Sequence, residues 1–202
     1  MVIWSILTQP AWEELQRNGC LRATRSHAEE DFLVAYDWMV RQMEYRLAAS
    51  RPSEESMPIW GWRRLGDRRK PDLRTSGHLP KGVRGVRVEC RVENNQVLLS
   101  DFELWHYVLN YWYLPKSEKD GESFDKKLAC AGLSVYDCSH HKRLPDVTLH
   151  REVEKSWERI FDLSWSDPGN HIVPSEKDRW IQATAWELLL DDVVESTEFV
   201  AR

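Results

Sequence analysis

The chain has 202 residues, of which 42% are hydrophobic and 30% charged, and its formal net charge is −5. This composition fits one compact domain and excludes a disordered protein, and no apolar run reaches the length that a membrane helix requires. The first sixteen residues contain Glu13 and Glu14 and no basic stretch, unlike a signal peptide. We therefore expect a cytoplasmic protein whose four cysteines are free thiols.

Two compositional features ask for an explanation: eleven tryptophans, and one strongly basic segment in an acidic chain. Between Trp62 and Arg91 there are ten lysines and arginines against three acidic residues. Such a stripe suits a phosphate-bearing partner, either nucleic acid or a dinucleotide. A solvated face that complements the acidic remainder of the chain explains it equally well.

The N-terminal part predicts a strand, a short helix and then a long helix. Residues 2–7 are apolar and extended, and Pro10 and Gly19 are placed to begin and end a helix over residues 11–17. The chain is expected to resume an extended path at Leu21. A longer helix is predicted from about Ala28, because apolar side chains recur every three to four residues at Phe32, Tyr36, Met39 or Val40, Met43 and Leu47.

The middle of the chain predicts strands around a basic loop. Residues 58–62 read as a strand that projects Trp60 and Trp62 to the same side. The basic loop that follows, residues 63–82, holds five glycines and prolines and is a candidate for covering a ligand. Residues 83–92 and 97–99 flank a turn at 93–95, which predicts a hairpin.

The second half predicts two helices and a final pair of strands. Ser100 to Glu103 match a capping box that opens a helix to about Trp112, before Pro115. Residues 116–145 have weak periodicity and are interpreted as an insertion or edge. The remaining predicted elements are a helix over 146–161, a loop over 164–178, a strand over 181–190, a turn at 191–192 and a strand over 197–200.

These elements predict an α+β fold in which a mixed, mainly antiparallel sheet is flanked by helices. The chain is expected to form a single domain over residues 1–202. We find no internal repeat in the sequence.

Glu187 is the clearest candidate for a functional side chain. Strand alternation places it on the face of Ile181, Ala183 and Ala185, which is otherwise apolar. A carboxylate on such a face is paired, lies at an open cleft or has a raised pKa, and clefts are where such groups do chemistry. The alternative is a glutamate at a strand end that reaches solvent or an arginine.

Other chemical signatures are weak. Cys130, Cys138, His140, His141 and His150 lack the close ligand pairs of structural zinc sites, so no metal is expected. Glycines 77, 82 and 85 form neither a phosphate loop nor a dinucleotide fingerprint. No cysteine or serine has a histidine at a diagnostic offset.

The tryptophans divide by context. Those on predicted helices are expected in the core: Trp12, Trp38, Trp105 and Trp157. Those on predicted strands, Trp4, Trp60, Trp62 and Trp186, lie beside polar groups. They suit either stacking on a base or nicotinamide, or ordinary core filling.

Several segments together resemble a bacterial family known as domain-of-unknown-function family 3841. These segments are IWSILTQPAWEELQRNGCLRA, AYDWMVRQM, MPIWGW, KPDLR, VLLSDFELWHYVLNYWYLP, KSWERIFDL and IQATAWEL. The resemblance covers nearly the whole chain except residues 116–145. It implies no activity by itself.

More distantly, the opening strand, the short helix ending in glycine and the closing segment QATAWELLLDDVV resemble the ADP-ribosyltransferase superfamily. That resemblance implies NAD as substrate and Glu187 as the catalytic glutamate. The family's first-strand His or Arg is absent, so the resemblance leaves contact with the dinucleotide to other residues. The candidates for NAD binding are Trp4, Ser5, Thr8, Tyr36, Trp60 and Gln182.

Two hypotheses follow. The first is an NAD-dependent ADP-ribosyltransferase-like enzyme that modifies a macromolecule, either nucleic acid or protein. In it, phosphate or nucleic acid would meet the basic loop at Arg68, Arg69, Lys70 and Arg74. The second is a non-enzymatic binding or regulatory module that uses the same loop, such as a component of a phage-defence system or of a toxin–antitoxin pair with an antitoxin protein as partner.

Overall fold

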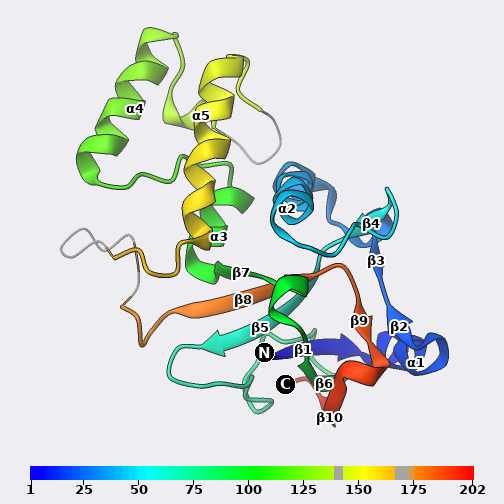
Figure 1. Ribbon diagram of the computed structural model, residues 1–202. Coiled ribbons are helices and arrows are strands. Elements are labelled where there is room, and N and C mark those ends of the chain that lie inside the picture. The colour runs from blue at the N-terminus through cyan, green and yellow to red at the C-terminus, as the bar shows by residue number, and fades with distance from the viewer. Residues whose placement is uncertain (139–142, 167–172, 174) are drawn as a thin grey trace.

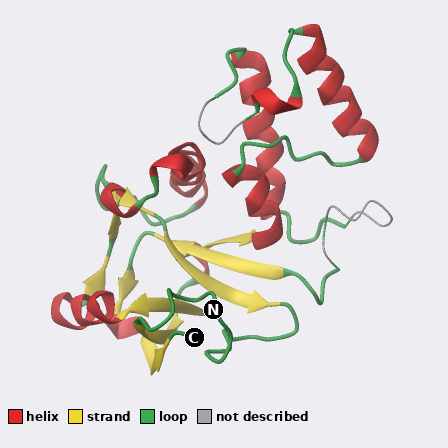
Figure 2. Ribbon diagram, turned by 180° about the vertical axis from the view of Figure 1, so that it is seen from behind, coloured by secondary structure: helices red, strands yellow, loops and turns green. Residues whose placement is uncertain are grey.

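The computed structural model describes residues 1–138, 143–166, 173 and 175–202, and these form an α+β fold built on one six-stranded sheet. Figures 1 and 2 show the sheet in one half of the molecule and most of the helices gathered over the other half. Neighbouring strands of this sheet all pair antiparallel. Their order is β10 (Val193–Val200), β6 (Arg84–Arg91), β1 (Val2–Thr8), β5 (Ile59–Leu65), β8 (Trp180–Ala185) and β7 (Leu98–Asp101). The antiparallel α+β core predicted from the sequence is confirmed.

Two short strand pairs and five α-helices complete the described structure. The short pairs are β2 (Cys20–Leu21) with β9 (Leu188–Leu189), and β3 (Ala23–Thr24) with β4 (Ser56–Met57). The helices are α1 (Gln9–Asn18), α2 (Leu33–Arg46), α3 (Phe102–Leu109), α4 (Glu118–Cys130) and α5 (Val147–Trp157).

The apolar core has two parts. One lies between the sheet and α1, where Leu15 packs with Val86 and Val88 of β6. The other joins α2, α3, α4 and α5, and in it the Trp38 and Trp157 rings meet edge to face with centroids 5.5 Å apart. Burial of the four helix tryptophans is confirmed: Trp12, Trp38, Trp105 and Trp157.

The first helix forms where the sequence places its boundaries, but the second does not. Thr8 caps α1 by accepting a hydrogen bond from the amide of Ala11, and Gly19 ends the helix with a φ of 74°, which favours glycine. The long helix α2 begins at Leu33 rather than at Ala28, because two 3₁₀ turns, Arg25–His27 and Glu30–Phe32, precede it.

The predicted hairpin between residues 83–92 and 97–99 is wrong. Both strands exist as β6 and β7, but β6 pairs with β1 on one edge and β10 on the other. Both of its edges are therefore occupied, and β7 instead pairs with β8 at the far edge of the sheet.

The helix after β7 differs from its prediction at both ends. Its cap is Asp101, whose carboxylate accepts the amide of Leu104, and not Ser100, which remains in the strand. It ends at Leu109 because Tyr111 takes a φ of 57° and the amide of Trp112 turns back to the carbonyl of Tyr107.

Residues 116–145, expected as an insertion or edge, contribute helix α4. Phe124 and Leu128 of α4 are buried in the same cluster as Val153 of α5. With only two buried apolar side chains, α4 gives too weak a periodicity to be predicted from the sequence.

The predicted strand over residues 181–190 is interrupted. Strand β8 ends at Ala185, the chain bends at Trp186 and Glu187, and Leu188 and Leu189 pair with β2 instead. Trp186 turns inward, where its indole donates a hydrogen bond to the carbonyl of Ala49. The alternation that placed Glu187 beside Ala185 therefore does not continue through the bend.

A buried ion pair joins the sheet to the helical half. The Arg179 guanidinium lies 3.2 Å from the Asp101 carboxylate, and both side chains are less than 5% exposed. Arg179 also donates hydrogen bonds to the carbonyls of Leu163 and Trp165. One side chain thus ties the start of β8 to the first turn of α3 and to the segment after α5.

Replacing Asp101 by Asn is expected to lower the free energy of unfolding by about 3 kcal/mol, because it leaves the Arg179 charge buried without its counter-ion. Urea denaturation followed by tryptophan fluorescence measures the change. The matched control is Glu198→Gln, which removes a partner of Arg84 in an exposed pair. It should change stability by less than about 0.5 kcal/mol. Equal effects of the two substitutions would contradict this role for Asp101.

A partly buried polar network links α2, α5 and the turn after α3. The Tyr111 hydroxyl shares a hydrogen bond with Nδ1 of His150, whose Nε2 lies 3.4 Å from Glu154. Glu154 in turn accepts a hydrogen bond from Arg41 of α2. Burial lowers the pKa of His150, and the neighbouring Glu154 carboxylate opposes that shift.

Acidification should therefore destabilise the fold through His150. Below about pH 6.5 the unfolded chain binds a proton that the folded imidazole resists, so this contribution to stability is present above that pH and is lost as the pH falls. Differential scanning fluorimetry at about pH 7.5 and about pH 5.5 should show a smaller drop in melting temperature for His150→Gln than for the wild-type protein. The same drop in both proteins would exclude His150 as a source of the pH dependence.

Candidate functional site

The two central strands of the sheet stay paired over a very short distance. Strand β1 pairs with β6 along its whole length, but it pairs with β5 at one register position, Trp4 opposite Trp62. Beyond that position the hydroxyl of Ser5 donates a hydrogen bond to the carbonyl of Trp60. The strands separate from there, and the separation opens a cavity between them, which we name the split cavity.

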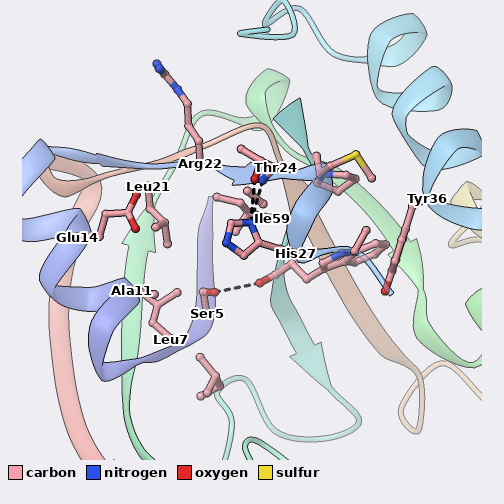
Figure 3. Close-up of a pocket in the computed structure, with 16 residues that line it drawn as sticks. Ser5, Leu7, Ala11, Glu14, Leu21, Arg22, Thr24, His27, Tyr36 and Ile59 are labelled. Atoms are coloured by element: carbon pink, nitrogen blue, oxygen red, sulfur yellow. Dashed lines mark hydrogen bonds between the residues drawn. The ribbon is translucent and has the colours of Figure 1, made fainter. Parts of the chain in front are cut away.

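The split cavity has a volume of about 360 Å³. Its walls come from β1, α1, the chain between Leu21 and Ala28, α2 and the beginning of β5 (Figure 3). Of the predicted NAD-binding residues, it brings together Ser5, Tyr36 and Trp60. Its size and mixture of aromatic and polar walls are those of a small-molecule site.

His27 is an exposed residue that lines this cavity (Figure 3). Its Nδ1 accepts a hydrogen bond from the backbone amide of Thr24 at 3.2 Å. In the neutral imidazole the proton must then be on Nε2, which leaves that nitrogen as a hydrogen-bond donor. The local sequence fixes the tautomer without any contact from outside the segment.

An aromatic cluster forms the opposite wall. The Tyr36 ring lies 6.3 Å from Trp60 and stacks on Trp105, with centroids 6.5 Å apart. Burial raises the pKa of Tyr36, and the nearby Glu29 adds to that shift, so its hydroxyl remains neutral. Because Tyr36 and Trp60 both line the cavity, a flat ring that entered it would meet aromatic surface on this wall.

Glu187 does not line the split cavity, and Figure 3 shows the side chain of its partner, Arg22, pointing away from the cavity. The Glu187 carboxylate pairs with Arg22, which does line the cavity, at 2.7 Å. The Glu187 side chain is 31% exposed and the Arg22 side chain 51%. The hydrogen bond with Glu187 raises the pKa of Arg22. The partner expected in the alternative interpretation of Glu187, an arginine, is therefore present.

The remaining predicted residues do not converge on this cavity. Thr8 caps α1, and Gln182 is buried in the sheet between Trp62 and Ser100. Trp4 alternates with Ser5 along β1 and donates its indole N–H to Glu89. It lines a different cavity, so Trp4, Trp60 and Glu187 do not form a single pocket.

The basic loop forms two further cavities. One is lined by Trp4, Arg87 and the four cationic residues predicted to contact phosphate, Arg68, Arg69, Lys70 and Arg74. The other lies against Trp62, Phe102 and Trp180 and shares Arg68 and Lys70 with the first. The basic loop therefore places its cationic side chains around these two cavities.

Three residues of these sites were missed in the sequence: Arg22, His27 and Trp180. Thr24 and His27 have the spacing of a small capping motif, which was a signal for a fixed imidazole. Arg22 and Trp180 carry no such local signal, because their importance comes from contacts with distant parts of the chain.

Within the described ranges, no three His, Cys, Asp or Glu side chains are grouped as a metal site would require. His140 and His141 lie outside the described residues. Among the helices that the structure describes, none is long and apolar enough to cross a membrane.

Comparison with known proteins gives one match. The profile of a family described as a domain of unknown function, DUF3841, matches residues 2–194. No curated protein and no solved structure matches the chain.

Proposed function

Since the chain belongs to the DUF3841 family, whose description names no activity, we propose from its own site that it binds NAD in the split cavity and transfers ADP-ribose to a macromolecule. The observation that carries the proposal is the cavity between β1 and β5, with aromatic rings on one wall and the Arg22–Glu187 pair beside it.

The split cavity suits the nicotinamide end of a dinucleotide. Tyr36 and Trp60 offer surface for a flat ring, and Nε2 of His27 is a donor for a carboxamide or a ribose oxygen. Arg22 beside the cavity, once its side chain turns toward it, is a planar cation of the kind that binds a diphosphate with two parallel hydrogen bonds.

Arg22 also connects binding to catalysis. The diphosphate of NAD competes with Glu187 for the same guanidinium, and an exposed ion pair such as this one is readily exchanged. Binding of NAD would then release the Glu187 carboxylate toward the ribose. The arginine that neutralises Glu187 in the free protein is the one that the substrate would occupy.

In this proposal, Glu187 acts by electrostatic stabilisation of the transition state. The bond between C1′ of the ribose and the nicotinamide nitrogen breaks, and the nitrogen keeps the electron pair. A carboxylate that accepts a hydrogen bond from the ribose 2′-hydroxyl stabilises the positive charge that develops on the sugar. A nucleophilic atom of the acceptor then forms the new bond to C1′ and loses its proton to solvent.

A second function is favoured by the position of Glu187 outside the cavity lining. In that case the split cavity binds a nucleotide without turnover, and the protein acts as a regulatory or binding module. The toxin–antitoxin and phage-defence roles belong to this second proposal. NAD binding without release of nicotinamide would distinguish it from the enzyme.

Glu187→Gln should lower the rate of nicotinamide release from NAD by about a hundredfold or more, because a neutral amide loses the charge that stabilises the transition state. Labelled NAD with mixed protein, RNA and DNA acceptors provides the assay. Glu198→Gln, on the exposed edge strand β10, is the matched control and should leave the rate unchanged. Undiminished release in Glu187→Gln would exclude the catalytic role.

His27→Ala should weaken NAD binding about tenfold, the loss expected for one hydrogen bond from a defined donor. Isothermal titration calorimetry measures the dissociation constant. His78→Ala, in the basic loop, is the control and should bind NAD as the wild-type protein does. An unchanged dissociation constant in His27→Ala would place NAD outside the split cavity.

A further inference from the structure

The basic loop encloses one continuous binding surface on the sheet face that carries Trp4 and Trp62. Its two cavities have volumes of about 790 and 870 Å³ and share Arg68, Lys70 and Asp72 as a common wall. Arg87 of β6 fastens the loop to the sheet by donating a hydrogen bond to the carbonyl of Pro71. We name the residues lining these two cavities the loop surface.

The loop surface has an excess of positive charge that its own acidic residues do not balance. Asp72 pairs with both Arg68 and Arg74, and its hydrogen bonds with Arg74 hold the pKa of that carboxyl well below its usual range. Within the described part of the chain, Arg69, Lys70 and Lys177 have no ion-pair partner. Six lysines and arginines therefore line the two cavities against three carboxylates, those of Asp67, Asp72 and Asp178.

An aromatic platform lies in the larger cavity. Trp180 stacks on Phe102, with ring centroids 5.8 Å apart and planes 20° apart, and Trp62 meets both rings edge to face. Trp180 is 40% exposed, although it begins a central strand. Packing against Phe102 and Trp62 fixes the orientation of the ring, and it leaves indole surface open to the cavity.

We propose that the loop surface binds single-stranded nucleic acid, with a base stacked on Trp180 and the adjacent phosphates held by Arg69, Lys70 and Lys177. An indole beside unpaired cations is the combination that single strands require, because each nucleotide presents one ring and one negative charge. An acidic peptide would use the cations and leave the platform unused. A duplex has its bases stacked on each other and cannot offer a ring to Trp180.

The loop surface and the split cavity are separate. They have no lining residue in common, so binding of a single strand can be measured without NAD. The surface supplies an acceptor for ADP-ribose only if the proposed function also holds.

The test is fluorescence anisotropy without NAD, with labelled oligo(U) and oligo(dT) of about twelve nucleotides. Trp180→Ala should weaken binding about tenfold, and Trp180→Phe should restore most of the loss, because a phenyl ring still stacks. The double substitution Arg69→Glu with Lys70→Glu should weaken binding at least tenfold. It should also reduce the slope of log affinity against log salt concentration by the amount expected for about two phosphate contacts.

Matched controls lie on the helical half of the protein. Trp112→Ala removes a tryptophan that is 50% exposed, and Lys119→Glu with Lys126→Glu reverses two exposed charges on α4. These variants should bind as the wild-type protein does. Because NAD is absent, a failure here leaves the nicotinamide-release assay unaffected.

Three results would each overturn the proposal. The first is wild-type affinity in both variants, Trp180→Ala and the double charge reversal Arg69→Glu with Lys70→Glu. The second is competition by polyglutamate as strong as by oligonucleotide, which would indicate an acidic protein as partner. The third is equal affinity for a duplex of the same sequence.

Discussion

The fold depends on one buried contact between opposite charges, the Arg179–Asp101 pair. Both groups lose their hydration on folding, and the ion pair together with further hydrogen bonds from each side chain offsets that cost. Asp101 caps α3 with its other oxygen, and Arg179 binds two backbone carbonyls. Within the described residues it is the one ion pair with both side chains buried, and it sets where the helical half meets the sheet. The platform residues Phe102 and Trp180 each follow directly after a member of this pair in the sequence.

Local features of the chain predicted the elements that local interactions determine. Helices α1, α2 and α5 have an apolar stripe, and α1 is also bounded by Pro10 and Gly19. The hairpin prediction for β6 and β7 failed because the turn signal at 93–95 says nothing about which strands compete for the edges of β6. Its actual partners come from the two ends of the chain.

The candidate site was predicted in part for the same reason. Ser5, Tyr36 and Trp60 meet at the split cavity as expected, because each lies on an element that the sequence defines well. Glu187 was singled out by strand alternation, but the inward turn of Trp186 ends the strand before that residue. Its partner Arg22 is 165 residues away in the chain, and no spacing rule reaches that far.

The single register position between β1 and β5 divides the sheet into two three-stranded lobes, β10–β6–β1 and β5–β8–β7. Few backbone hydrogen bonds cross this seam, so the angle between the lobes is the softest coordinate of the sheet. The split cavity lies at this seam and is lined by residues of both β1 and β5. Trp4 and Trp62 face each other at the seam, and each lines one cavity of the loop surface. The basic loop joins β5 of one lobe to β6 of the other, so it crosses the seam together with the two cavities that it lines.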